Sequence, residues 1–364
     1  MKSVKGGKHL RNLHVLHGET SIDGCAFFPA IQTHNRNDQT ERKPKQNMKT
    51  MSKTTVTAAL AFGLSLAMTD GLRADSFGSG VNAFTIDFVT VGNPGNSDDA
   101  GAGGGSYSSP YGGVSYTYRM GVYEISQDAI TKATNLGMTN VTAGAWGASQ
   151  PAANMQWYEA AAFVNWLNTS KGYQAAYNLT YSGGWSMSLW SSGQAWQAGG
   201  ENLYRHKDAF YFLPSEDEWY KAAYHQNNGV TADYWDYATG SNTAPTAVAS
   251  GTGAGTAVYN GVTSSPAAVG NAGGLSPYGT MGQNGNVWEW NESLLLNGTA
   301  RGRRGGSFHN SHSHLASTYR NYGYQCLEEY DTGFRVAQAV PEPSSVVTLL
   351  GGLAGLIRLK RRKA

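Results

Sequence analysis

The chain has 364 residues, and its 27 Lys and Arg against 25 Asp and Glu give a formal net charge of +2. The charges are unevenly placed: residues 1–53 carry a net +6 and residues 341–364 a net +4, whereas residues 75–340 hold 11 basic and 19 acidic side chains. An acidic central body excludes the basic surface with which proteins bind nucleic acid, so we expect no nucleic-acid partner.

The first 74 residues divide into a polar segment and a segment typical of secretion signals. Residues 1–47 are basic and lack a hydrophobic pattern, so we expect them to be unstructured and hypothesise that translation begins at Met48 or Met51. Residues 48–74 combine two lysines, an uncharged apolar run and a small residue, Ala74, that suits cleavage. This layout predicts a secretory signal peptide that the Sec translocon handles; the alternative is a buried core helix.

Cysteine usage does not indicate a disulfide framework. The chain has 2 cysteines, Cys25 and Cys326. Because Cys25 lies in the segment that we expect the mature protein to lack, we expect no internal disulfide bond.

Hydrophobic periodicity and capping signals predict a body with short regular elements. In chain order these are a strand at residues 115–125 and helices at residues 126–137, 154–172 and 213–225. Ser215 and Glu218 form a capping-box pattern at the start of the last helix, and Gly172 suits the position after the end of the second. We expect one α+β domain over residues 84–337, a large size for a single domain but an allowed one.

A tryptophan-rich stretch at residues 183–200 has two interpretations. Trp190 and Trp196 are candidates for a surface on which sugar rings stack. Equally, aromatic side chains of this kind fill the core of loop-rich domains. The sequence leaves both interpretations open.

The C-terminal segment, residues 341–364, joins three distinct features. Pro341, Glu342 and Pro343 precede an apolar run, and five basic residues close the chain. The segment resembles the PEP-CTERM sorting signal of Gram-negative bacteria that produce exopolysaccharide, which implies processing by a membrane-embedded exosortase. The basic end is suited to stay in the cytoplasm while the apolar run anchors the chain transiently in the inner membrane. A plain membrane anchor is the alternative, and both place the body outside the cytoplasm.

Four stretches of the body are distinctive together: "PAANMQWYEAAAFVNWLN", "YFLPSEDEWYKAAYH", "GNVWEWNES" and "RRGGSF" with the later "STYRN" and "TGFRVA". In this order they resemble the formylglycine-generating enzyme family, also called sulfatase-modifying-factor domains. Upstream, residues 84–99 and 118–126 resemble the usual opening of that family. The resemblance implies a compact, loop-rich single domain related to C-type lectins, with several small aromatic cores.

The chemistry of the catalytic members is not expected in this chain. In those members, two cysteines in the Gly-Gly-Ser-aromatic segment bind copper and oxidise a substrate cysteine. The matching positions here are Asn310 and Leu315, and neither side chain supplies the soft thiolate that copper(I) prefers. We therefore expect neither copper nor formylglycine-generating activity, which makes the chain a pseudoenzyme of the family.

The same segment could instead line a cleft for a peptide or glycan. The candidate residues are Arg304, Ser307, His309, Asn310, His312, His314 and Arg320. Arg301, Arg303 and Arg304 either meet an anionic group or form a solvated basic turn. The enzymatic alternative is a metal-dependent oxidoreductase that uses the three histidines. In an extended segment, His312 and His314 would share one face and His309 would lie on the other.

Calcium stays an open possibility, because some family members carry it beside the "GNVWEW" motif. The matching ligands would be the carbonyls of Gly285 and Val287 and the carboxylate of Glu289, with Asn260 at a second site. Gly282 stands where a side-chain ligand is expected, which weakens the set, since calcium requires six to eight oxygens. In the "TGFR" stretch, Arg335 is suited to pair with a buried carboxylate such as Glu218 or Glu289.

These expectations together describe an exported protein of the cell envelope or extracellular space. Its sulfatase-modifying-factor domain lacks the two catalytic cysteines, so a binding role or an association with the exopolysaccharide matrix is expected.

Overall fold

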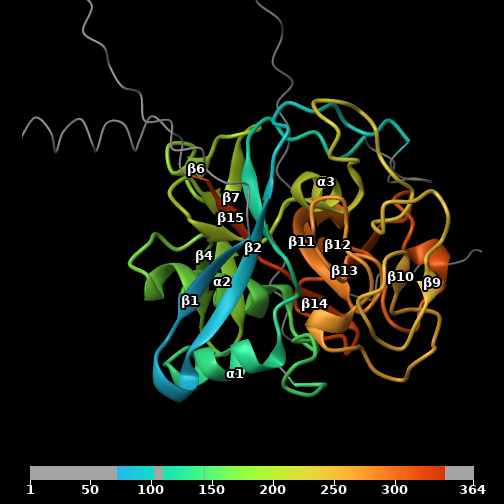
Figure 1. Ribbon diagram of the computed structural model, residues 1–364. Helices are drawn as coiled ribbons and strands as arrows, with labels where there is room; N and C mark the ends of the chain where they lie inside the picture. Colours follow the sequence, from blue (N-terminus) through green and yellow to red (C-terminus); the bar gives the residue numbers. More distant parts are fainter. Residues whose placement is uncertain (1–71, 102–109, 143, 341–364) are drawn as a thin grey trace, which may run out of the picture.

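The computed structural model describes residues 72–101, 110–142 and 144–340 (Figure 1). The expectations for residues 1–47, for most of residues 48–74 and for residues 341–364 lie outside the described residues. In the described part, no helix combines the length and the apolar character needed to cross a membrane. This part forms a loop-rich α+β domain, as the sequence predicts.

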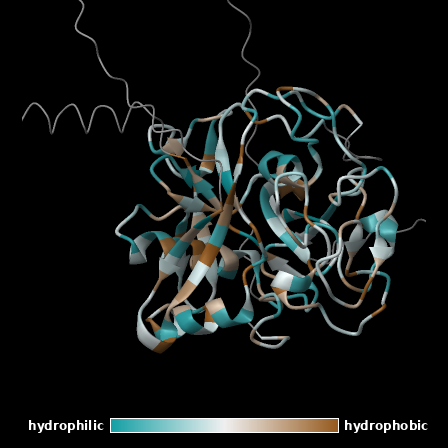
Figure 2. Ribbon diagram, viewed as in Figure 1, coloured by the Kyte–Doolittle hydropathy of each residue, from teal (hydrophilic) through white to brown (hydrophobic). Residues whose placement is uncertain are grey.

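A five-stranded antiparallel sheet runs across one side of the domain. Its strands, in spatial order, are β1 (Arg73–Phe77), β2 (Phe84–Val91), β3 (Tyr118–Gly121), β15 (Ala337–Ala339) and β8 (Tyr211–Phe212). Apolar and polar residues alternate along much of β2, which Figure 2 shows, so this strand presents one face to the core. Phe84 packs against Phe163 and Trp166 of α2 (Trp157–Ser170), at ring-centroid distances of 6.5 and 6.1 Å.

The three helices predicted from the sequence are confirmed as α1 (Gln127–Asn135), α2 and α3 (Glu216–Tyr224). The oxygen of Ser215 accepts a hydrogen bond from the main chain of Glu218, whose carboxylate accepts one from the main chain of Ser215. The capping box thus fixes the start of α3. Gly172 lies directly after the end of α2 with φ +76°, a left-handed conformation that glycine adopts without strain. The predicted strand at 115–125 is shorter than expected, because only Tyr118–Gly121 pairs with β2 and β15.

A second, four-stranded sheet carries the segments that matter for function. Its spatial order is β13 (Asn321–Tyr324), β12 (Ala300–Arg304), β11 (Trp288–Leu295) and β14 (Thr332–Phe334). β11 pairs with β12 in antiparallel and with β14 in parallel orientation. The smaller elements are the pairs β4 (Asn178–Tyr181) with β5 (Trp185–Ser188), β6 (Ala195–Trp196) with β7 (Asn202–His206) and β9 (Thr246–Ala247) with β10 (Thr256–Ala257), and the 3-10 turns η1 (Gly80–Asn82), η3 (Val269–Asn271), η4 (Leu296–Gly298) and η5 (His312–His314).

The core consists of one large cluster and smaller aromatic ones. The large cluster joins the five-stranded sheet to α2 and includes Trp157 and Trp290, both 0% exposed. A second cluster surrounds Trp219 on α3, and a third contains Leu315. These separate clusters explain how a domain with so much loop stays ordered, since each loop covers its own apolar group.

The folded body extends upstream of residue 84, because β1 completes the edge of the first sheet. Ala74 pairs with Asp87, so cleavage after Ala74 would remove two residues of β1 and leave Asp75 as the first. The buried carboxylate of Asp75 accepts a hydrogen bond from the Tyr211 hydroxyl at 2.8 Å. Tyr211 therefore holds the new end of the strand on the sheet.

Cys326 is disulfide-bonded in the structure. The expectation of no internal disulfide bond depends on the loss of residues 1–47, which lie outside the described residues, so for the mature protein it stays a prediction.

Candidate functional site

The segment at residues 305–315 follows β12 and begins with two glycines in left-handed conformations. Gly305 has φ +96° and Gly306 has φ +75°. A Cβ atom on Gly305 would lie 3.2 Å from the Trp219 ring, and one on Gly306 would lie 2.7 Å from Leu315 Cδ1. Only glycine lets the backbone pass this close to the core, so the segment turns sharply at the end of the sheet.

Asn310, which the resemblance aligns with the first catalytic cysteine, closes a small turn. Its Oδ1 atom accepts hydrogen bonds from the Ser307 main-chain N–H at 2.9 Å and from the Ser307 hydroxyl at 2.7 Å. Its carbonyl accepts a bond from the Asn260 N–H at 2.7 Å. The amide side chain thus has a structural role, and it offers no soft ligand.

Leu315, which the resemblance aligns with the second catalytic cysteine, belongs to the core. It is 0% exposed and packs with Tyr237, Ala257 and Tyr259. Its carbonyl accepts a hydrogen bond from the Tyr224 hydroxyl at 3.0 Å. Cys326 is disulfide-bonded and provides no thiolate either. The described residues therefore contain nothing that replaces the pair of copper-binding thiolates.

The three histidines of the segment face three different sets of partners. The His309 ring stacks on Tyr330, with centroids 5.7 Å apart, and its Nε2 atom lies 3.6 Å from the Asp331 carboxylate. His312 Nδ1 lies 3.2 Å from the Tyr237 hydroxyl. His314 Nδ1 lies 3.0 Å from the Ser311 hydroxyl, and its ring contacts Tyr319. The contacts described for the three imidazole rings thus include no partner that two of the rings share.

The expected alternation of these histidines along an extended segment is wrong, because His312–His314 forms the 3-10 turn η5. In the part of the chain that the structure describes, no group of three or more His, Cys, Asp or Glu residues is placed to hold a metal ion. The geometry therefore gives no support to a metal-dependent oxidoreductase.

The arginines before the segment are buried, so both expectations for them are wrong. β12 is an inner strand of the second sheet, and Arg304 is 0% exposed. Arg304 and Arg320 each place Nε 2.8 Å from Glu216 Oε1, so one carboxylate joins both guanidinium groups. Arg301 donates to the Glu292 carbonyl at 2.7 Å and lies over the Trp157 ring. These arginines stabilise the sheet and the start of α3; they do not form a basic turn.

Ser307 is also buried, so it reaches no open surface. Of the predicted cleft residues, His309 and His312 are exposed, whereas Asn310, His314 and Arg320 are partly exposed. The segment thus presents separate polar side chains at the surface and does not form the arginine-lined cleft that the sequence suggests.

The pairing predicted for Arg335 is confirmed with Glu289, and not with Glu218. Arg335 donates to both carboxylate oxygens of Glu289 at 2.6 and 2.5 Å, and Trp219 Nε1 donates to Oε2 at 2.7 Å. Arg335 also donates to the carbonyls of Gly121, Val122 and Met281. Both side chains are 0% exposed.

This pair decides how well calcium would fit beside Gly285 and Val287. Glu289 is the only charged ligand in the expected set, and both of its oxygens already bind a guanidinium group or an indole N–H. A divalent cation there would meet a neutralised carboxylate next to a buried positive charge. The residues do not fit calcium, and we do not propose it. Asn260 lies exposed on a turn with φ +63°.

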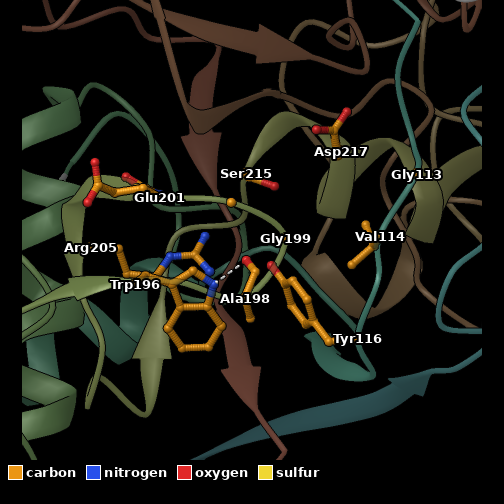
Figure 3. Close-up of a pocket in the computed structure, with 12 residues that line it drawn as sticks. Gly113, Val114, Tyr116, Trp196, Ala198, Gly199, Glu201, Arg205, Ser215 and Asp217 are labelled. Atoms are coloured by element: carbon orange, nitrogen blue, oxygen red, sulfur yellow. Dashed lines mark hydrogen bonds between the residues drawn. The ribbon is translucent and has the colours of Figure 1, made fainter. Parts of the chain in front are cut away.

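A pocket of about 200 Å³ lies between the β6–β7 connection, residues 113–116 and the start of α3 (Figure 3). Its lining includes Tyr116, Trp196, Glu201, Arg205 and Asp217. Of these lining residues, only Trp196 was predicted from the sequence to have a binding role, as a candidate for stacking on sugar rings. The others are far apart in the sequence, and no local pattern connects them.

Comparisons with known proteins agree with this architecture. The family described as "Sulfatase-modifying factor enzyme 1-like domain" (FGE-sulfatase) matches residues 83–340. Among curated proteins, none matches this chain.

Three solved structures are similar to this chain at low sequence identity. Treponema denticola variable protein 1 is 21% identical, covers 73% of this chain and 98% of its own, and has a TM-score of 0.47. The protein CarF is 18% identical, covers 70% and 98%, and has a TM-score of 0.49. PvdO from Pseudomonas aeruginosa is 14% identical, covers 73% and 98%, and has a TM-score of 0.47.

The family match extends over most of the chain, and over nearly all of the residues that the structure describes. The chain therefore belongs to the sulfatase-modifying-factor (FGE-sulfatase) family.

Proposed function

We propose that this chain is a non-catalytic member of its family that is exported and serves as a binding protein at the cell envelope. The proposed loss of catalysis is supported by the contacts of Asn310 and Leu315, the residues at the two expected catalytic positions. Leu315 is packed in an apolar cluster, and the Asn310 amide oxygen is bonded to Ser307. Copper(I) chemistry needs soft sulfur ligands, and these two positions offer none.

Export is proposed from the sequence at both ends of the chain. Residues 48–74 have the layout of a signal peptide, and residues 341–364 resemble a sorting signal that an exosortase processes. The proposed partners are thus the Sec translocon and an exosortase during export, and the exopolysaccharide matrix afterwards. The acidic body supports a role outside nucleic-acid binding.

Incubation of the purified protein with copper(I), oxygen and a cysteine-containing peptide is expected to leave the peptide cysteine unchanged. The physical reason is that Asn310 and Leu315, at the expected catalytic positions, provide no thiolates to hold copper next to the substrate sulfur. Mass spectrometry of the peptide, with an aldehyde-reactive probe, measures the outcome. A family member that retains both cysteines serves as the positive control. Formation of the aldehyde above the level of a protein-free control would show that the proposed loss of catalysis is wrong.

A further inference from the structure

Two adjoining cavities flank the β6–β7 connection. The first is the pocket of Figure 3. The second measures about 340 Å³, and both are lined in part by Glu201, Asn202 and Ser215. Together they reach the size of small-molecule sites, about 300–1,000 Å³. Neither includes a residue of the Gly305–Leu315 segment, so this site is separate from the one that lost its cysteines.

Among the charged residues that line the two cavities, carboxylates predominate. Asp217 lines the first cavity, Glu292 lines the second, and Glu201 lines both. Among the lining residues, Arg205 is the only basic one. An environment of this composition has a negative potential, which favours a positively charged guest.

The charge of Arg205 is already compensated inside the protein. Its Nη1 and Nη2 atoms donate to Glu218 at 3.0 and 2.8 Å, and its Nε and Nη2 atoms donate to Glu292 at 3.0 and 2.6 Å. One guanidinium group therefore pairs with two carboxylates, so the cluster of Arg205, Glu218 and Glu292 has one negative charge in excess. Because the oxygens of Glu218 and Glu292 already accept internal hydrogen bonds, and Arg205 Cζ lies 5.0 Å from the Trp196 ring centroid, a guest cation would depend for its direct contacts on Glu201 and Asp217.

Two aromatic rings complete the wall, and both are held in place. Trp196 Nε1 donates to the Ala198 carbonyl at 2.9 Å, and the Tyr116 hydroxyl donates to Glu218 at 2.7 Å. The rings meet edge to face, with centroids 5.8 Å apart. Figure 3 shows the two rings at the lower side of the pocket and the carboxylates of Glu201 and Asp217 at the upper side. Aromatic rings opposite carboxylates are a favourable arrangement for an organic ammonium group.

We propose that this pocket binds the ammonium group of a small organic cation. Rings and carboxylates attract the charged nitrogen, while Asn202 and Ser215 provide hydrogen bonds to polar atoms beside it. Two sources share this chemistry: an amino sugar of the extracellular matrix and a free alkylamine. The inference deepens the proposed binding role and rests on it.

Acid should weaken binding, because Asp217 titrates in an accessible range. Burial, with the nearby charges of Asp98, Glu216 and Glu218, raises the pKa of Asp217 to about 6, although a hydrogen bond from the Gly112 N–H opposes the rise. Asp217 is ionised above this pH and attracts a cation; below it, the neutral acid does not. The affinity for an ammonium group should therefore fall as the pH decreases from 7.5 through 6 to 5.

Calorimetric titration of the purified protein tests the proposal with three probes: glucosamine, n-butylammonium and glucose. Saturable binding is expected for at least one of the two ammonium probes at pH 7.5, with markedly weaker binding of glucose. Binding of glucosamine alone assigns an amino sugar, and binding of n-butylammonium alone assigns an alkylamine. Binding of both assigns the ammonium group as the recognised element. Equal binding of glucose and glucosamine, or no binding of either amine, would overturn the proposal.

Two variants connect the binding to this pocket. Asp217→Asn should weaken ammonium binding about tenfold at pH 7.5, the equivalent of one lost charge contact, and should abolish the pH dependence. Glu201→Gln, at an exposed position, should weaken binding without any risk to folding. Asp208→Asn is the matched control, because its side chain is 66% exposed and lines neither cavity. Unchanged affinity in both test variants would overturn the assignment. If the protein does not bind ammonium probes, the result of the peptide-oxidation assay still stands. Conversely, aldehyde formation in that assay would say nothing about ammonium binding in this pocket.

Discussion

Replacement of Arg205 by methionine is expected to lower the free energy of unfolding by about 3–5 kcal/mol or more. The guanidinium is 1% exposed and lies between Glu218 and Glu292, which are themselves buried. Removal of the cation leaves two carboxylates close together without a cationic partner, and burial makes each uncompensated charge costly. Chemical denaturation followed by tryptophan fluorescence measures the loss.

The pH dependence separates this electrostatic effect from simple loss of packing. Burial alone would raise the pKa of Glu218, but Arg205 and the hydrogen bonds from Ser215 and Tyr116 hold it below its usual value. In the wild type, the stability from Glu218 is present above the unfolded pKa and is lost as the pH falls through the folded pKa. In Arg205→Met, only the hydrogen bonds from Ser215 and Tyr116 oppose the effect of burial on the pKa of Glu218, so protonation of Glu218 should restore stability on acidification.

The difference in the free energy of unfolding between the wild type and Arg205→Met should therefore decrease from pH 7 to pH 4. Lys132→Met is the surface control, because Lys132 pairs with Asp128 in an exposed i,i+4 contact worth about 0.3–0.5 kcal/mol. A difference that stays constant with pH would show that Arg205 acts through packing alone.

Glu289→Gln is expected to destabilise the domain by about 3–5 kcal/mol, because it leaves the Arg335 guanidinium charged and buried. Arg335 and Glu289 are both 0% exposed, and the pair connects the end of β14 to β11. The neutral amide presents N–H groups toward the donors of Arg335 and Trp219, so it cannot reproduce both carboxylate contacts. Thermal unfolding and denaturant titration measure the effect.

A double-mutant cycle identifies the pair as the cause. Glu289→Leu with Arg335→Met should lose less stability than the sum of the two single changes, because no unpaired charge stays behind. Glu328→Gln, at an exposed carboxylate, should change the stability by less than about 0.5 kcal/mol. Additive losses in the cycle would contradict the coupling inferred from the geometry.

Local signals made the helices predictable. The capping box of Ser215 and Glu218 depends on residues three positions apart, and the Gly172 stop depends on one backbone angle, so both can be predicted without tertiary information. The family resemblance predicted the fold, since its stretches extend over the whole body. The correspondence of Asn310 and Leu315 with the two catalytic cysteines comes from the same resemblance and stays a prediction.

Contacts between distant residues explain what could not be predicted. Arg304 looked solvated because the sequence shows three arginines within four residues. It is buried because β12 lies inside the sheet and Glu216, 88 positions earlier, receives it. The histidines appeared to form a cluster because they are close in sequence, yet η5 turns them toward different partners.

The ammonium pocket was missed for the same reason. It brings Tyr116, Trp196 and Asp217 together from three separate segments, and no spacing rule connects residues so far apart. Only the aromatic richness of residues 183–200 pointed toward it, and that signal fitted a packed core equally well.

An anaerobic titration of copper(I) into the purified protein tests most directly the proposed loss of the copper site from the family fold. Competition with a chelator of known affinity for copper(I) measures the stoichiometry. The Asn310 amide and the buried Leu315 predict no tight binding, and any weak uptake by the exposed His309 and His312 should disappear at low chelator concentration. Tight binding of one copper per chain that is lost in His312→Ala would contradict the account.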